Sequence, residues 1–480
     1  MPLESKKIDK QKVGPFQFKQ LDGQYLLTNF IGDHIFLKPS SFDAFLSGKI
    51  EKVSPDEYSQ LQDKGFLRDQ LNFDNLAQRY AQKNMFLGRK GTTLHIVVVT
   101  LRCDHKCVYC QASSRDLKEN ELDMDVATAK KVVDRIFESL SKGITIEFQG
   151  GEPLVNFEVI KFIVKYAQEK NKEAKKDLRF ALVSNLTFMN TNIVKYLLEN
   201  NIHICTSLDG PERVHNKCRV ASGKKNSHKN VVKWASRLIK EYKKANSTNK
   251  LFALTTITRF SLPFPKEIVD EYVKLGLEGM HLRPLSTFGT NKKAWQPLAF
   301  SGSDFLVFYK KALDHIIDLN MKGKDFHERF AVIFLTKILT DKEMGYLDLR
   351  SPCGAGIGQM AYNFNGDVYA CDEGRMMSRH GDESFRLGNV NTGSYDDFFN
   401  SNVVKTMCIA SCLDNLPACN QCVYKPYCGV CPLQNYIVNE SIFNTSAFWC
   451  EVHKGILDYL FIKLKDEKTK NLFYKWVNRS

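Results

Sequence analysis

Between residues 91 and 285, short apolar runs alternate with longer stretches in which apolar residues recur every three or four positions. The apolar runs have the length of β-strands and cover residues 94–101, 144–149, 180–184, 203–208, 251–257 and 280–285. The longer stretches, such as "ATAKKVVDRIFESLSKG" and "NVVKWASRLIKEY", have the periodicity of amphipathic helices. Apolar strands that are each followed by such a helix predict an α/β fold with a parallel sheet covered by helices. Six units favour a partial (β/α)6 TIM-type barrel over a complete barrel of eight.

The pattern changes on both sides of this barrel. Residues 1–90 predict a small α+β module, in which "QYLLTNFIGDHIFLKP" forms two short strands joined by a turn. Ser40 or Ser41 is expected to cap a helix, and a second helix is expected to end near Gly65. The module resembles winged-helix domains that bind leader peptides; a simple cap over the barrel is the alternative. After the barrel (91–290) we expect a helical bridge (291–345), a cysteine-rich domain (346–455) and a C-terminal helix (456–480).

Composition narrows the class of protein. No run approaches the ~20 apolar residues of a membrane span, and the first residues, "MPLESKKIDKQKVGPF", lack the apolar core of a signal peptide. We therefore expect a cytoplasmic protein that does not contact membranes. The net charge of +14 is compatible with a nucleic-acid partner. The lysines are spread over helix-like stretches, however, so we expect a solvated surface and no bound nucleic acid.

The 14 cysteines suggest metal or redox chemistry, because nothing in the sequence points to secretion and disulfides. Cys103, Cys107 and Cys110 directly follow the first predicted strand, at the end of a barrel strand where functional residues lie. Three thiolates can bind three irons of an iron–sulfur cube and leave the fourth iron open for a small molecule. The alternative is a structural zinc site in which His105 is the fourth ligand.

The Cys-x3-Cys-x2-Cys spacing, with the aromatic Tyr109 before the last cysteine, resembles the signature of radical S-adenosylmethionine (SAM) enzymes. The resemblance implies that Cys103, Cys107 and Cys110 hold a [4Fe–4S] cluster beside Tyr109, and that its open iron binds the amino and carboxylate groups of SAM. In that family an electron from the cluster splits SAM into methionine and a 5′-deoxyadenosyl radical, which removes a hydrogen atom from an unactivated carbon. The protein positions the substrate and excludes water.

Further cofactor contacts are expected at the ends of the next strands. Gly150 and Gly151 allow the backbone to approach a ligand closely, and together with Glu152 they form a "GGEP" sequence that resembles the family's motif for the SAM amino group. Arg219 is suited to the SAM carboxylate, because a guanidinium binds carboxylates in a bidentate manner. Polar residues at the third and fourth strand ends are suited to ribose hydroxyls, or else to capping the following helices. These residues are Ser184, Asn185, Ser207 and Asp209.

The cysteine-rich region resembles the SPASM auxiliary-cluster extension, whose members mostly modify peptides and proteins. Its central run, "CNQCVYKPYCGVC", has spacings of two, five and two, where the last is usually three. Position implies two auxiliary [4Fe–4S] clusters, one on Cys419, Cys422, Cys428 and Cys450, and the other on Cys353, Cys371 and Cys431. A further cysteine that some members carry just after the first is absent, so the second set has an open iron or uses Cys408 or Cys412. Zinc ribbons are the alternative for such cysteine pairs.

Asp372 follows Cys371 directly. In sulfatase-maturating relatives an aspartate at this place acts as the base, and a carboxylate beside a buried cluster is suited to accept a proton. The alternative is a charged turn residue in "CDEGR".

Several phrases, "YLLTNFIGDHIFL", "LHIVVVTLRC", "IEFQGGEPL" and "CVYKPYCGVCP", are most similar to the radical maturases of His-Xaa-Ser systems, which modify a small partner protein. We therefore expect a maturase that acts on a peptide or small protein and receives electrons from a donor such as flavodoxin or ferredoxin. One alternative is an anaerobic sulfatase-maturating enzyme that forms formylglycine. The other is a non-catalytic iron–sulfur or zinc scaffold, which would not need "GGEP".

Overall fold

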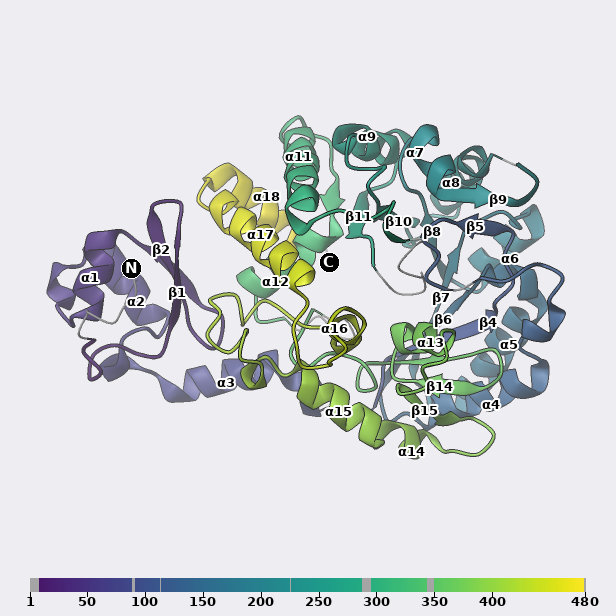
Figure 1. Cartoon of the computed structure of the whole chain (residues 1–480), viewed down its shortest axis with the longest axis horizontal. Helices are drawn as coiled ribbons and strands as arrows, with labels where there is room; N and C mark the ends of the chain where they lie inside the picture. The colour runs from purple at the N-terminus through teal and green to yellow at the C-terminus, as the bar shows by residue number, and fades with distance from the viewer. Residues whose placement is uncertain are drawn as a thin grey trace.

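The computed structural model describes residues 8–88, 91–112, 114–224, 226–286, 295–342 and 349–478. Its centre is a sheet of parallel strands that are covered on the outside by helices, with the C-terminal helices between this barrel and the N-terminal module (Figure 1). The parallel strands, in spatial order, are β4 (Leu94–Thr100), β6 (Gly143–Gly150), β7 (Asp177–Ser184), β8 (Ile202–Ser207), β10 (Phe252–Ile257) and β11 (Gly279–Pro284). This order confirms the predicted partial barrel.

Helices follow the strands as the periodicity predicted. They are α4 (Val126–Glu138), α5 (Phe157–Ala174), α6 (Thr191–Glu199), α7 (Glu212–Cys218), α8 (Ser227–Lys244) and α9 (Pro265–Leu275). Burial alternates along β6: Ile144, Ile146 and Phe148 are fully buried, whereas Glu147 and Gln149 are only half-buried and line a cavity. The strand is therefore apolar towards the helices and polar on its inner face, which leaves polar side chains available for a site.

The barrel sheet continues beyond these six strands. β12 (His327–Glu328) pairs with β11, and β13 (Gln359–Tyr362) pairs in parallel with β4. β14 (Asp367–Tyr369) and β15 (Arg386–Asn389) extend the sheet to ten strands. The cysteine-rich region is thus built directly onto the first barrel strand, an arrangement that the sequence did not predict.

The N-terminal module is an antiparallel sheet with three helices. The predicted hairpin is confirmed as β2 (Gln24–Thr28) and β3 (His34–Leu37), and an unpredicted strand, β1 (Gln17–Leu21), pairs with β2. The helices are α1 (Pro39–Leu46), α2 (Pro55–Asp63) and α3 (Phe73–Lys83). The expected cap at Ser40 or Ser41 is wrong, because Pro39 already occupies the first helical turn and Lys38 is the N-cap. Proline is favoured there, since its missing N–H would have no helical partner.

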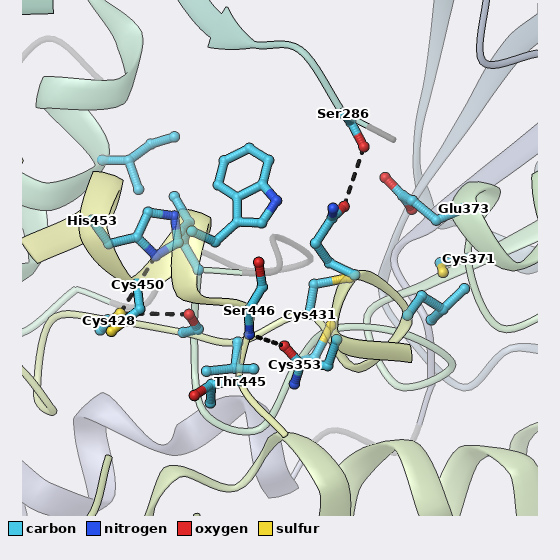
Figure 2. A pocket seen from close by; sticks show the side chains of 18 of the residues that line it. Ser286, Cys353, Cys371, Glu373, Cys428, Cys431, Thr445, Ser446, Cys450 and His453 are labelled. Carbon is cyan, nitrogen blue, oxygen red and sulfur yellow. Dashed lines mark hydrogen bonds between the residues drawn. The ribbon is translucent and has the colours of Figure 1, made fainter. Parts of the chain in front are cut away.

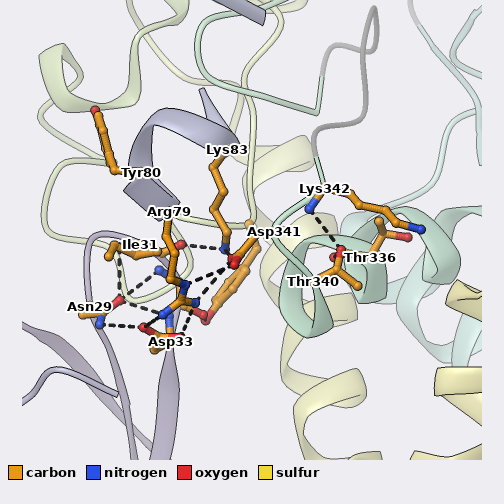
Figure 3. A network of polar contacts seen from close by, with 12 residues as sticks. Asn29, Ile31, Asp33, Arg79, Tyr80, Lys83, Thr336, Thr340, Asp341 and Lys342 are labelled. Carbon is orange, nitrogen blue, oxygen red and sulfur yellow. Dashed lines mark hydrogen bonds and ion pairs between the residues drawn. The ribbon is translucent and has the colours of Figure 1, made fainter. Parts of the chain in front are cut away.

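A polar network fastens this module to the rest of the chain (Figure 3). The guanidinium of Arg79, on α3, lies between the carboxylates of Asp33 (2.7 Å) and Asp341 (3.0 Å). Lys83 donates from Nζ to the carbonyl oxygen of Ile31 at 2.6 Å. The side-chain hydrogen bond to Asp33 is the main cause of the raised pKa of Arg79. The network joins the turn before β3 to the segment that follows α12 (Arg329–Leu339).

The remaining helices build the bridge and the cysteine-rich region. They are α11 (Gly302–Met321), α12, α13 (Asp372–Ser378), α14 (Tyr395–Phe399), α15 (Asn402–Ser411), α16 (Pro432–Asn439), α17 (Ala447–Lys463) and α18 (Glu467–Val477). The expected single helix over 456–480 is wrong. One helix begins at Ala447 and therefore includes Cys450, and a second begins after Asp466, whose side chain caps it by accepting from the Thr469 N–H. Among the described residues, no helix has the length and apolarity of a membrane span.

Candidate functional site

The loop after β4 carries Cys103, Cys107 and Cys110, all half-buried. A short strand, β5 (His105–Cys107), pairs with β9 (Arg219–Ala221), so that Cys107 lies opposite Arg219. A turn closes the loop, in which the Cys110 N–H donates to the Cys107 carbonyl at 3.1 Å. Burial raises the pKa of the Cys107 thiol to about 12. Burial and, secondly, the charge of Glu152 raise the pKa of Cys103, which places the "GGEP" glutamate beside this loop.

The two glycines of "GGEP" pack against the backbone that carries the cysteines. A Cβ on Gly150 would lie 2.3 Å from the carbonyl oxygen of Thr100, and one on Gly151 would lie 2.3 Å from that of Arg102. The Gly151 N–H donates to Thr100 O (2.9 Å), and the Glu152 N–H donates to Arg102 O (2.8 Å). Gly150 and Gly151 were expected to let the backbone approach a ligand closely. In this structure they let the end of β6 approach the backbone of the cysteine loop.

Glu152 is fully buried in a cradle of hydrogen bonds. Its carboxylate accepts from Ser184 Oγ (2.7 Å), Asn185 N (2.7 Å) and Leu154 N (3.1 Å). Burial nevertheless raises the pKa of Glu152 to about 7. In this structure Ser184 and Asn185 hold the glutamate. The Ser184 hydroxyl also accepts from the Leu186 N–H at 2.9 Å, but the alternative that Ser184 caps the following helix is wrong, because Asn190 is the N-cap of α6.

Asp209 does not present a free carboxylate for a ribose. It is fully buried, and its oxygens accept from Tyr109 Oη (2.5 Å) and from the Thr256 N–H (3.1 Å). Arg219 Nε lies 3.3 Å from the same carboxylate. Asp209 also does not cap α7, whose N-cap is Pro211. The expected cap is therefore wrong, and in this structure Asp209 holds Tyr109 and Arg219.

Ser207 ends β8 on the inner face of the barrel and is half-buried. Arg219 stands with its guanidinium 5.5 Å from the centre of the Tyr109 ring. Its Nε is buried without a hydrogen-bond partner within the described part of the chain. Although Nε also faces the Asp209 carboxylate at 3.3 Å, the position of the guanidinium beside the cysteine loop fits the expected carboxylate of a bound ligand.

His105 is held by the protein and is not free to bind zinc. Its Nδ1 lies 2.9 Å from Asp104 Oδ1, and its Nε2 lies 2.8 Å from Ser227 Oγ. The ligand atoms of Cys103, Asp104 and His105 lie within 4.8 Å of one another. Because both ring nitrogens are engaged, the set available to a metal consists of the three thiols, which fits an iron–sulfur cluster with one open iron.

A cavity of about 280 Å³ lies between the inner face of the barrel and the cysteine-rich region. Seven cysteines line it: Cys353, Cys371, Cys419, Cys422, Cys428, Cys431 and Cys450. Figure 2 shows Cys353 beside Cys431 and, separately, Cys428 beside Cys450. Neither Cys408 nor Cys412 lines the cavity, so nothing places them at either set.

Mutual electrostatic effects divide these cysteines as expected. Besides burial, neighbouring Cys431 and Cys353 raise the pKa of Cys371. Burial and the thiols of Cys450 and Cys422 raise the pKa of Cys419 to about 11. The structure therefore brings together three cysteines in one set and four in the other, with thiols as the donors in both.

Carboxylates also line the cavity: Glu147, Asp372 and Glu373. Asp372 begins α13 and accepts from Arg375 Nε at 2.7 Å, while Arg375 itself is only 1% exposed. Arg375 Nη1 is buried without a hydrogen-bond partner among the described residues. Glu147 accepts from Gln149 Nε2 at 2.6 Å, and burial raises the pKa of Glu147.

Sequence reasoning missed Glu147, Gln149 and Arg375. The alternation of polar and apolar positions in "ITIEFQGG" was the available signal for the first two.

A hydrogen-bonded path connects the first cysteine loop with the cysteine-rich region. Gln111, next to Cys110, donates to the Ser286 carbonyl at 3.3 Å. Ser286 Oγ in turn donates to Gln434 Oε1 at 3.2 Å, and Gln434 lines the cavity with Cys431 (Figure 2). Ser286 also lines the cavity, so these bonds connect the first cysteine loop to its wall.

Comparison with known proteins supports this division of the chain. Residues 97–259 match the Radical SAM superfamily, and residues 353–423 match SPASM, an iron–sulfur cluster-binding domain. A cysteine-type anaerobic sulfatase-maturating enzyme of Clostridium novyi is 22% identical over 78% of this chain and 96% of its own length. An uncharacterised protein of Methanocaldococcus jannaschii is 32% identical over 38% of this chain, and the match spans 60% of that relative.

Two solved structures share the fold. Native anSMEcpe with bound AdoMet has a TM-score of 0.66 and 19% identity, covering 80% of this chain and 99% of that one. Streptococcus suis SuiB bound to its precursor peptide SuiA has a TM-score of 0.53 and 12% identity, covering 90% of this chain and 98% of that one. The two matched family models are those of SAM-dependent radical proteins and of iron–sulfur cluster-binding domains, the two cofactors that the cysteine spacing indicated.

Proposed function

Because the chain carries a radical SAM domain followed by a SPASM domain, we propose that it is a maturase that modifies a residue of a partner peptide or small protein, as in His-Xaa-Ser systems. The observation that carries the proposal is the cavity between the barrel and the cysteine-rich region, where Glu147, Gln149 and Asp372 stand beside both auxiliary cysteine sets. A peptide side chain entering this space would meet the groups of both domains.

The residues fit the cofactors that the proposal requires. Cys103, Cys107 and Cys110 would hold the first cluster, and the guanidinium of Arg219, which lies opposite Cys107, fits the carboxylate of SAM. Glu152 lies beside Cys103 and would accept from the amino group of SAM, which would favour its charged form. When bound, these cofactors supply the one-electron chemistry that removes a hydrogen atom from an unactivated carbon.

The chain's own residues have three tasks in this proposal. The barrel and the cysteine-rich region exclude water from the cavity. Gln149, held by Glu147, is placed to donate to or accept from the substrate. Asp372, held by Arg375, is placed to accept the proton that an oxidised substrate releases. The auxiliary clusters would be held by Cys353, Cys371 and Cys431 and by Cys419, Cys422, Cys428 and Cys450, and an external flavodoxin or ferredoxin would supply the electrons.

Sulfatase maturation is the second candidate. It is favoured by the similarity to the Clostridium novyi enzyme over 96% of that enzyme's length. The N-terminal module favours the first candidate, because the winged-helix likeness expected from its sequence would suit it to bind the leader segment of a peptide. SuiB, which was solved with its precursor peptide, shares the fold over 90% of this chain.

The test is anaerobic. The full chain is reconstituted with iron and sulfide, reduced with dithionite and given SAM, and then incubated either with a protein that contains His-Xaa-Ser repeats or with a Cys- or Ser-containing sulfatase peptide. We expect about twelve irons per chain, 5′-deoxyadenosine, and a mass change only in the repeat protein. A mass change only in the sulfatase peptide would select the second candidate. Zinc in place of iron, with SAM left intact, would refute both.

A further inference from the structure

His453 lines the cavity, and the proposed reaction does not use it. It lies on α17, three residues after Cys450, so both side chains are on the same face of that helix. Its Nδ1 is 3.5 Å from Cys428 Sγ (Figure 2). Cys450 and His453 of the same helix therefore both lie at the set of Cys419, Cys422, Cys428 and Cys450.

Aromatic rings fix the orientation of this imidazole. The His453 ring packs against Phe330 (5.9 Å between centroids, 88°), Phe334 (5.7 Å, 70°) and Trp449 (5.6 Å, 54°). The side chain is 7% exposed. A ring confined in this way cannot turn freely away from Cys428, and the low local dielectric strengthens any hydrogen bond that it makes.

Cys428 is held from two directions. Its backbone carbonyl accepts from Lys337 Nζ at 3.1 Å, and its sulfur faces His453. Lys337 belongs to α12, the helix that also supplies Phe330 and Phe334. The position of the sulfur relative to the ring is therefore set by the packing of α12 against α17.

The direction of the hydrogen bond follows from chemistry. A metal-bound cysteine is a thiolate, which has no proton to donate and can only accept. A contact between Nδ1 and that sulfur is then a hydrogen bond only if Nδ1 carries the proton. Donation to a cluster sulfur draws electron density from it and stabilises the reduced cluster, and hydrogen bonds to sulfur are among the factors that set cluster potentials.

We propose that His453 donates a hydrogen bond to the cluster ligand Cys428 and thereby raises the reduction potential of the auxiliary cluster on Cys419, Cys422, Cys428 and Cys450. The inference rests on the proposed function in one respect, that Cys428 is a cluster ligand. His453 is a positioning residue in this role, since it acts on the cluster through the cysteine and does not contact the substrate.

The test is a potentiometric titration of the reconstituted full chain, followed by electron paramagnetic resonance, with iron and sulfide counted in every sample. The midpoint that is present in the wild type and absent from Cys107→Ala is assigned to the first cluster. His453→Phe keeps an aromatic ring packed among Phe330, Phe334 and Trp449 but removes the N–H that donates to Cys428. His453→Asn restores an N–H near the position of Nδ1. His281→Phe is the matched control, because His281 lines the same cavity and packs on Phe330 (5.7 Å) without a described bond to sulfur.

We expect His453→Phe to retain its iron and to lower one auxiliary midpoint. At the original midpoint, the ratio of oxidised to reduced cluster would rise about tenfold, which is about 59 mV for a one-electron couple. His453→Asn and His281→Phe should leave both auxiliary midpoints near those of the wild type. An unchanged midpoint in His453→Phe would overturn the inference, and so would a loss of about four irons, which would make the histidine a ligand or a structural support. Absence of auxiliary clusters from the wild-type chain would instead overturn the proposed function.

Discussion

At the scale of single residues, the approach between β6 and the cysteine loop depends on a missing side chain. The Gly151 backbone lies so near Leu101 and Arg102 that a Cβ would stand 2.5 and 2.3 Å from their carbonyl oxygens. Those oxygens belong to the backbone that leads into Cys103, so they cannot move without moving the cysteine. The second glycine of "GGEP" therefore fixes the position of the first cysteine loop.

We expect Gly151→Ala to lower the iron retained after reconstitution and to destabilise the chain by about 3 kcal/mol or more, because overpacking against backbone forces the strand and the loop apart. Gly143→Ala, at the start of the same strand, is the control: its Cβ would meet nothing nearer than 3.9 Å. Iron content and thermal unfolding of both variants provide the measurement. Equal iron retention in the two variants would contradict this role for Gly151.

Residue types predicted which polar side chains gather at the strand ends but not the partner of each side chain. Glu152, Ser184 and Asp209 were all expected to face a ligand, and the sequence did not predict that Ser184 bonds to Glu152 and Asp209 to Tyr109. Strand ends collect polar groups whether these bind a ligand or one another. The choice between the two depends on distances across the sheet, which a local pattern does not contain.

At the scale of elements, the N-terminal sheet is attached to the cysteine-rich region by side chains from both. Thr28 Oγ1 donates to the Val423 carbonyl, and Tyr427 Oη donates to the Gly32 carbonyl, each at 2.7 Å. His34, on β3, packs edge-on against Phe461 of α17 with 5.0 Å between ring centroids. This interface makes the module a support for the segment between Cys422 and Cys428.

Acid should weaken this interface. Burial, with the charge of Lys64 as the next cause, lowers the pKa of His34 to about 4, against 6.5 for an ordinary histidine. Lys83 and Lys470 act in the same direction, and Asp33 opposes them. Between pH 6.5 and 4 the unfolded chain therefore binds a proton that the folded chain does not, so stability falls as the pH is lowered through this window.

We expect His34→Phe, which keeps the ring contact with Phe461, to lose less thermal stability than the wild type on acidification from pH 7 to 4. The exposed His380 provides the control, and His380→Gln should follow the wild type. Melting temperatures at several pH values measure the difference. Parallel pH profiles for His34→Phe and the wild type would rule out His34 as a source of the acid sensitivity.

The elements that the sequence predicted well are those whose pattern is local. Six barrel strands follow from short apolar runs, and their helices follow from a period of 3.6 residues within single segments. The pairing of β13 with β4 joins residues 359–362 to 94–97, and no local period reports such a contact. The break between α17 and α18 was missed for another reason: the Asp466 cap lies inside a stretch that is helical on both sides.

At the scale of the whole molecule, the proposed function divides the work between the cysteine sets of the two domains. We expect Cys107→Ala to abolish 5′-deoxyadenosine formation, because the first loop then offers only two thiolates. Cys422→Ala should lose about four irons yet still form some 5′-deoxyadenosine without modified product. Iron content, 5′-deoxyadenosine and product mass are measured on the same samples. Complete loss of 5′-deoxyadenosine in both variants, with the first cluster still present in Cys422→Ala, would contradict this division.

The contacts of Thr28 with Val423 and of Tyr427 with Gly32 each join positions 395 residues apart in the chain. During synthesis the N-terminal sheet leaves the ribosome long before its partners exist, and domains generally fold in that order. Contacts of such high sequence separation form late. The loop of Cys422 and Cys428 thus acquires this support only after residues 423–427 have been translated, so its cysteines reach their final positions late in folding.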